Sequence, residues 1–232
     1  MNTVTTLRTA PIMSVAVIVT LCLAMGGCIG CCTPSVYHGP ASSLDVRVTV
    51  LDLDEKPGDG RVPVVVQFLY SGNPVQIDPG ITVTCNGVTM AWSAAFFGHI
   101  ERIPLQQAKG IYEIVHREGR FISTARAVVP ERPVFKAPTI AGATIPRSTN
   151  FTIRYVADGG NAVLGRASDA RTNVSSSQMD DGSHDGLDVS GFAPGPGRLS
   201  ITRTLETPLP TTGFLSAQAI FEMNTSIAIT WQ

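Results

Sequence analysis

The sequence predicts an all-β protein in which two antiparallel β-sandwich modules follow an N-terminal export signal. Three observations support this prediction. Short runs that alternate apolar and polar residues recur from residue 44 to residue 232, and Gly, Pro, Asn and Asp separate them. The periodicity of amphipathic helices is almost absent from the same region. A short apolar segment followed by small residues lies at the N-terminus.

The first predicted module covers residues 44–131. Leu44–Val50 alternates apolar and polar side chains, which places its apolar residues on one face of a strand. Ile81–Cys85 and Val88–Trp92 flank Asn86-Gly87, and this dipeptide between two β-rich runs is the strongest short signal for a hairpin. Seven strands in about 90 residues are typical of a sandwich. The other expected strands are Val62–Tyr70, His99–Leu105, Ile111–Arg117 and Phe121–Val129.

A cluster of prolines predicts the boundary between the modules. Proline cannot donate a hydrogen bond to a β-ladder and favours extended, exposed segments. We therefore place a linker near residues 130–134 and assign residues 132–232 to the second module. The prolines of the cluster are Pro130, Pro133, Pro138 and Pro146.

The second module opens with a Pro-rich segment, Pro138–Pro146, which contains a Gly and precedes the alternating run Phe151–Tyr155. This stretch resembles the opening of Ig-like or fibronectin-like repeats in exported bacterial proteins. The resemblance implies a β-sandwich outside the cytoplasm and implies no activity, because such folds host many functions. Further expected strands are Ala162–Ala167, Arg198–Leu205, Phe214–Met223 and Ser226–Trp231.

The N-terminus reads as an export signal. Arg8 precedes an apolar run, Ile12–Ala24, that is shorter than the roughly 20 residues of a membrane-spanning helix. Ala24-Met25-Gly26-Gly27 followed by Cys28 resembles the lipobox of bacterial lipoproteins, with Met25 where Leu is usual.

The lipobox resemblance implies cleavage before Cys28 and acylation of that cysteine. Residues 1–27 would then be the signal peptide and residues 28–43 a flexible tether, with the protein attached to a membrane in the cell envelope. The alternatives are ordinary signal cleavage, an uncleaved anchor, or lipidation at Cys31 or Cys32, which fit the pattern less well.

Composition narrows the classes of partner. The net charge is −1 and 15% of the residues are charged, so the basic surface expected of a nucleic-acid binder is not predicted. Cys85 is the single cysteine of the first module, which rules out the inter-sheet disulfide of immunoglobulins within it. Cys85 either pairs with Cys31 or Cys32 in an oxidising compartment or stands as a buried thiol.

The main metal hypothesis lies in an acidic loop at residues 180–188. Asp181, Ser183 and Asp185 match the first half of a calcium loop, and no other cofactor is predicted. The match ends at Asp188 and at Phe192, which stands where a bidentate Glu is required. The alternative is a solvated loop that joins two strands.

No catalytic motif is present, and we predict that the protein is not an enzyme. Adjacent Ser183, His184 and Asp185 cannot form a triad, because a triad is assembled from separate elements. Aromatic residues offer a platform for a glycan, although core packing is the commoner fate of such residues. Trp92, Phe96 and Phe97 cluster around the expected hairpin, whereas Trp231 stands alone.

The sequence thus favours a lipid-anchored, extracytoplasmic binding or structural module whose protein or glycan partner is unknown. A carbohydrate-binding accessory lipoprotein and a hydrolase with a site that lacks a motif are the two alternatives. The first requires exposed coplanar aromatics, and the second requires a deep pocket with converging polar groups.

Overall fold

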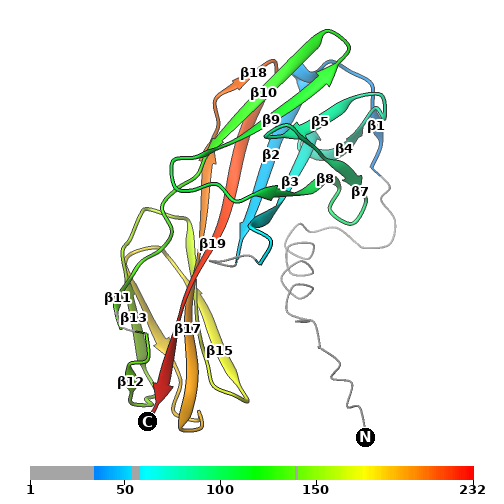
Figure 1. The fold of residues 1–232 in the computed structure, drawn as a ribbon. Coiled ribbons are helices and arrows are strands. Elements are labelled where there is room, and N and C mark those ends of the chain that lie inside the picture. The colour runs from blue at the N-terminus through cyan, green and yellow to red at the C-terminus, as the bar shows by residue number, and fades with distance from the viewer. Residues whose placement is uncertain (1–33, 54–57, 139–140) are drawn as a thin grey trace, which may run out of the picture. The chain divides into compact units, whose positions relative to one another are not determined.

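The computed structural model describes residues 34–53, 58–138 and 141–232. Residues 35–232 form one compact unit. The described part of the chain contains a short 3-10 helix and nineteen β-strands (Figure 1), which confirms the all-β prediction. The predicted signal segment, residues 1–27, and Cys28 lie outside the described residues.

The folded unit begins inside the segment predicted as a tether, residues 28–43. β1 (Val36–Tyr37) pairs in parallel with β4 (Asn73–Ile77), and the 3-10 turn η1 (Ala41–Ser43) leads into β2 (Asp45–Asp52). The Tyr37 ring also packs on the Tyr70 ring, with 5.1 Å between the centroids. This part of the tether prediction is corrected, because residues 35–43 belong to the sandwich.

Two sheets enclose the first core. In one sheet β2 pairs with β3, and β3 pairs on its other side with β4 and β8. The other sheet has the order β6-β5-β9-β10. The bounds of these strands are β3 (Arg61–Tyr70), β5 (Thr82–Cys85), β6 (Val88–Thr89), β7 (Ala91–Ser93, paired with β8), β8 (Gly98–Pro104), β9 (Ile111–Glu118) and β10 (Phe121–Val128).

The predicted hairpin at Asn86-Gly87 is confirmed. Both residues have positive φ, 49° and 78°, as a type I′ turn requires. Cys85 pairs with Val88 across the turn. Cys85 itself is a free thiol buried in the first core, and burial raises its pKa to about 12.

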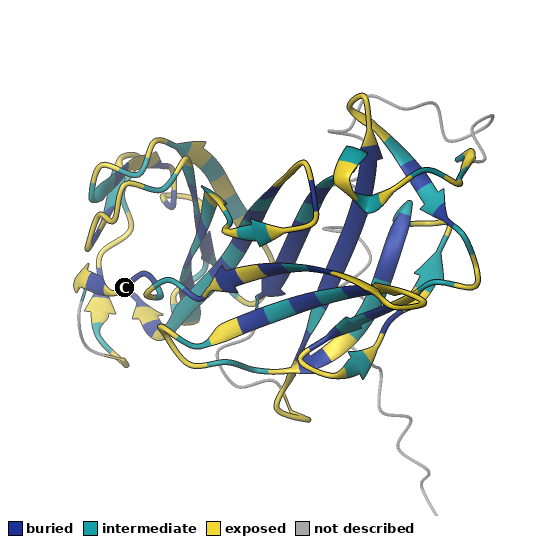
Figure 2. Ribbon diagram, turned by 90° about the horizontal axis from the view of Figure 1, so that it is seen from above, coloured by how far each residue is buried: buried dark blue, intermediate teal, exposed yellow. Residues whose placement is uncertain are grey.

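Two sheets also enclose the second core. One sheet has the order β11-β13-β16, and β15, β14, β17 and β19 follow one another in the other, with β12 beside β19. Buried and exposed residues alternate along these strands, as in the first sandwich (Figure 2). The bounds are β11 (Phe135–Ala137), β12 (Thr144–Ile145), β13 (Phe151–Tyr155), β14 (Ala162–Ser168), β15 (Asn173–Gln178), β16 (Ser183–Leu187), β17 (Gly195–Pro208) and β19 (Ser216–Trp231).

Both sandwiches follow the strand order of the Ig-like fold, in which strands A, B and E form one sheet and C, F and G the other. In the first sandwich β2, β3 and β8 correspond to A, B and E, and β5, β9 and β10 to C, F and G. In the second, β11, β13 and β16 face β14, β17 and β19 in the same roles. The Ig-like prediction is confirmed by this order.

One long two-stranded ribbon runs through both sandwiches. β17 (Gly195–Pro208) and β19 (Ser216–Trp231) pair antiparallel over 14 residue pairs, from Gly195 opposite Trp231 to Pro208 opposite Gln218. Beyond the second sandwich, β19 lies parallel to β2, with Ser216 opposite Asp45. At the turn of the ribbon, β18 (Thr211–Thr212) pairs with β10 in the other sheet of the first sandwich.

Because of this ribbon, the two hydrophobic cores do not separate along the chain at the predicted boundary at residue 131. Phe214, Phe221 and Met223 lie in the first core, whereas Ile229 and Trp231 lie in the second. The two strands expected at residues 214–223 and 226–231 are one continuous strand. The C-terminal part of the chain therefore completes the first sandwich as well as the second.

Trp231 is the largest fully buried side chain of the second core. The rings of Phe151 and Phe192 meet it edge-on, and its Nε1–H donates to the carbonyl of Ser168 at 2.9 Å. Gly197 of β17 provides the space for the indole, because a Cβ at this position would lie 2.1 Å from Trp231 Nε1. A side chain at residue 197 and an indole at residue 231 therefore exclude each other.

We expect Gly197→Ala to destabilise the protein by about 1–3 kcal/mol, the usual cost of overpacking a core. The matched control is Gly191→Ala, since no atom lies within 4 Å of a Cβ at that exposed position. Urea unfolding of both variants measures the difference. Equal stability of the two variants would contradict the packing of Trp231 against Gly197.

Candidate functional site

A band of polar side chains lies where β19 passes from the first core to the second. We call it the polar junction, and it consists of Asp52, Arg132, Asp180, Arg203 and Asn224. Asn224 of β19 directly follows Met223 of the first core. These residues come from segments far apart in the sequence, so the fold alone brings them together.

Asn224 connects three segments. Its Nδ2 donates to the carbonyl of Leu53 at 3.2 Å, and its Oδ1 accepts a hydrogen bond from Thr202 Oγ1 at 3.1 Å. Its own carbonyl accepts a hydrogen bond from Arg132 Nη1 at 2.6 Å. The end of β2, the middle of β17 and the segment after β10 are thus fixed to one residue of β19.

Arg132 adds an ion pair to this connection. Its Nη2 contacts Asp52 Oδ1 at the end of β2. The Asp52 side chain is 5% exposed and that of Arg132 is 27% exposed, so water screens this pair less than a surface pair. The segment that links the two sandwiches is therefore held to the first sandwich by a shielded charge.

The second ion pair of the junction is fully buried. Arg203 Nε lies 2.8 Å from Asp180 Oδ2, and the two side chains are 1% and 0% exposed. The hydrogen on Arg203 Nε does not point at this oxygen. The Nη2 group of Arg203 donates a hydrogen bond to the carbonyl of Val156. Asp180 Oδ2 also accepts a hydrogen bond from Gly160 N at 2.8 Å. Such a pair is stable only while both partners are present.

The residues predicted to form a calcium loop make hydrogen bonds with other groups of the protein. Asp181 Oδ1 accepts from Ser183 N at 2.9 Å, Ser183 Oγ donates to Asp185 at 3.1 Å, and Thr152 Oγ1 donates to Asp185 Oδ1 at 2.6 Å. The hydrogen bonds from the Thr152 and Ser183 side chains lower the pKa of Asp185, and the one from Thr152 is the largest cause. Within the described ranges, no three His, Cys, Asp or Glu residues are grouped for a metal ion. Calcium binding stays a prediction.

The expected acidic loop is in part a strand. Residues 183–187 form β16, and His184 is fully buried between the sheets of the second sandwich. His184 Nε2 lies 2.7 Å from the carbonyl of Ser176, so this nitrogen carries the hydrogen. A Cβ at Gly165 would lie 2.6 Å from the imidazole. His184 is thus a core residue that faces away from Asp185, which is exposed.

Two other histidines are also core residues. His99 and His116 both pack edge-on against Phe68, and burial lowers the pKa of each imidazole. The lowered pKa favours the uncharged ring at neutral pH. The three buried histidines therefore line cores rather than a surface site.

The aromatic residues do not gather into one platform. Trp231 is 1% exposed in the second core. Trp92, Phe96 and Phe97 are half-buried on one segment of the first sandwich, and Trp92 packs edge-on against His99. Trp231 is therefore excluded from a glycan surface, and the three residues at 92–97 remain as the candidate.

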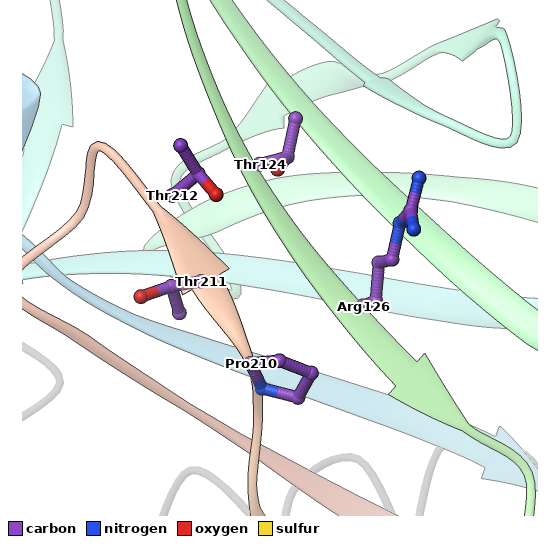
Figure 3. A pocket seen from close by; sticks show the side chains of 5 residues that line it. All are labelled: Thr124, Arg126, Pro210, Thr211 and Thr212. Carbon is purple, nitrogen blue, oxygen red and sulfur yellow. The ribbon is translucent and has the colours of Figure 1, made fainter.

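A shallow hollow of about 270 Å³ lies where β18 meets β10 (Figure 3). Its lining residues are Thr124, Arg126, Pro210, Thr211 and Thr212. Arg126 pairs with Glu113, with 2.7 Å between Nη2 and Oε1. Ligand pockets usually measure about 300–1,000 Å³ and are mostly apolar, so this hollow is small and polar for such a role.

Lipidation at Cys28 involves a residue outside the described ranges. Across residues 34–53, 58–138 and 141–232, none of the helical structure is of a length and apolarity that would span a bilayer.

We expect Asp180→Asn to destabilise the protein by about 3–5 kcal/mol, because it leaves Arg203 charged and buried without its partner. Adding Arg203→Met to Asp180→Asn should restore part of that loss. Asp158→Asn is the control, since Asp158 lies 3.8 Å from Arg203 and is 46% exposed, and its loss should cost under about 1 kcal/mol. Urea unfolding measures the loss in the free energy of unfolding. If the losses caused by Asp180→Asn and Arg203→Met simply add in the double variant, the buried pair is contradicted.

No protein-family model and no curated protein matches this chain. Among solved structures it is similar to extracellular domains 3–5 of Drosophila OTK, with 11% identity, 77% of this chain and 61% of that chain covered, and a TM-score of 0.25. It is also similar to domains 4 and 5 of the S-layer protein SbsC, with 13% identity, 82% and 99% covered, and a TM-score of 0.24. For the FN1–FN3 domains of chicken CNTN1 the values are 10% identity, 83% and 67% covered, and a TM-score of 0.22. This chain spans about three fifths of the OTK fragment.

Proposed function

We propose that the protein is an exported, lipid-anchored module that presents two joined Ig-like sandwiches outside the cytoplasm, where it acts by binding or as a structural spacer. The proposed role is non-catalytic, and the proposed partners are the membrane, through the lipid, and a protein or glycan. The observation that carries the proposal is the β17–β19 ribbon, which pairs with strands of both sandwiches.

The ribbon suits a spacer because it leaves little freedom between the sandwiches. Modules joined by a flexible linker reorient freely, whereas here a paired ribbon continues from one core into the next. The polar junction adds the ion pairs Arg132–Asp52 and Arg203–Asp180 around the crossing point. A force or a binding event at one sandwich would then be passed to the other.

The N-terminal pattern supports the membrane anchor. Gly27 precedes Cys28 as the small residue that cleavage before a lipidated cysteine requires, and the apolar run ahead of it is too short to span a bilayer. One acyl chain holds a protein only marginally, whereas several chains hold it durably. The multiple acylation of a bacterial lipoprotein would therefore keep the sandwiches at the membrane.

Labelling with radioactive palmitate in a bacterial host tests the anchor. We expect the full-length protein to carry the label and Cys28→Ser to lose it, because Cys28 supplies both the sulfur and the amine that are acylated. Cys31→Ser and Cys32→Ser are the controls and should keep the label. Label retained on Cys28→Ser would overturn lipidation at that residue.

A further inference from the structure

We propose that the end of the first sandwich at which the chain begins its fold lies against the lipid surface and inserts apolar side chains into it. This inference rests on the proposed function, since it uses lipidation at Cys28. The surface is the N-terminal rim, which we define as Val36, Tyr70, Phe121, Ile122 and Leu215. Each of these side chains is 43–65% exposed.

Contacts made by neighbouring residues connect the members of the N-terminal rim. The ring of Tyr37, next to Val36, packs on Tyr70 at 5.1 Å. Leu69, next to Tyr70, is opposite Asp45, and Leu215 N donates to the carbonyl of Leu44 at 3.0 Å. Val36, Tyr70 and Leu215 therefore occupy the same end of the sheet that contains β2 and β3.

The β9–β10 hairpin brings the remaining two members to this end. Ser123 Oγ donates to the carbonyl of Gly213 at 3.2 Å, which places Phe121 and Ile122 beside the segment that leads to Leu215. The opposite end of the first sandwich holds Leu53 and the polar junction. Figure 1 shows β1 and the tip of the β9–β10 hairpin at the same end of the first sandwich.

The chemistry of the N-terminal rim fits the interface of a bilayer. Phe121 and Leu215 are each 65% exposed, and several exposed apolar side chains gathered at one end mark an interaction site more strongly than single ones do. The guanidinium of Arg120 lies 5.4 Å from the centre of the Phe121 ring. Surfaces that bury apolar residues at the level of the lipid headgroups combine aromatic and aliphatic side chains with nearby arginine.

The length of the chain ahead of the fold selects a membrane as the occupant of the rim. From Cys28 to Ser35 the backbone can span at most about 25 Å, even when fully extended. An acylated Cys28 therefore keeps Val36 close to the headgroups. Because the tether is short, contact between the rim and the bilayer is effectively intramolecular. The effective concentration of the rim at the bilayer is then near the millimolar level. Weak apolar contacts then suffice to orient the sandwich.

Quenching by brominated lipids tests this orientation. The full-length protein, on a Trp92→Phe background, is reconstituted in 3:1 phosphatidylcholine–phosphatidylglycerol vesicles, so that buried Trp231 is the background indole. We expect the added indole of Phe121→Trp and of Leu215→Trp to be quenched at least twofold. Met179→Trp is the control, since Met179 is 77% exposed in the second sandwich and should not be quenched.

The outcomes separate this inference from the proposed anchor. Equal quenching of Phe121→Trp, Leu215→Trp and Met179→Trp would overturn the lipid contact and leave the N-terminal rim to a protein partner. Circular dichroism shows that each variant is folded. Rim quenching without palmitate on Cys28 would overturn lipidation alone, and palmitate without rim quenching would overturn the rim contact alone.

Discussion

The antiparallel pairing of β17 with β19 is the constraint on which the rest of the structure depends. Fourteen consecutive residue pairs form a single ribbon, and its two halves belong to different hydrophobic cores. In the second sandwich the ribbon supplies the F and G strands. In the first it adds β19 beside β2 and β18 beside β10, so it extends both sheets of a sandwich that already has its A, B, E, C, F and G strands. Neither sandwich can lose the ribbon without exposing apolar side chains and strand edges.

The polar junction provides partners for the polar groups of the ribbon where it passes from one core to the other. A ribbon that leaves one core and enters another must cross a zone where neither core covers its backbone, and unpaired polar groups there would be costly. Asn224 meets this need by bonding to three segments, while Arg132–Asp52 and Arg203–Asp180 supply shielded charge on either side. The contacts of Asn224 with Leu53 and Arg132, and of Arg132 with Asp52, also hold this crossing to the first sandwich, which links the fold to the proposed role as a spacer.

Local signals account for what the sequence could predict. Asn86-Gly87 specifies its own turn, and Leu44–Val50 reveals a strand by alternation alone. β15 escaped prediction because its side chains Asn173–Gln178 are mostly polar on an edge strand, and β16 because its strand character comes from pairing with β13. The β2–β19 ladder joins residues 171 positions apart, and Arg203 meets Asp180 only after folding, so neither leaves a local pattern. The apolar residues of the N-terminal rim were each visible, but their gathering at one end depends on the same long-range pairing.

The two tryptophans allow the most direct test of the shared ribbon, because Trp92 reports on the first sandwich and Trp231 on the second. The measurement is urea unfolding of Trp92→Phe and Trp231→Phe, each followed by fluorescence of the remaining indole and by far-ultraviolet circular dichroism. If both sandwiches depend on the β17–β19 ribbon, each variant unfolds in one transition and the two probes have the same midpoint. Two separate steps in the dichroism, with each indole following a different one, would show that the sandwiches fold independently and would contradict the account.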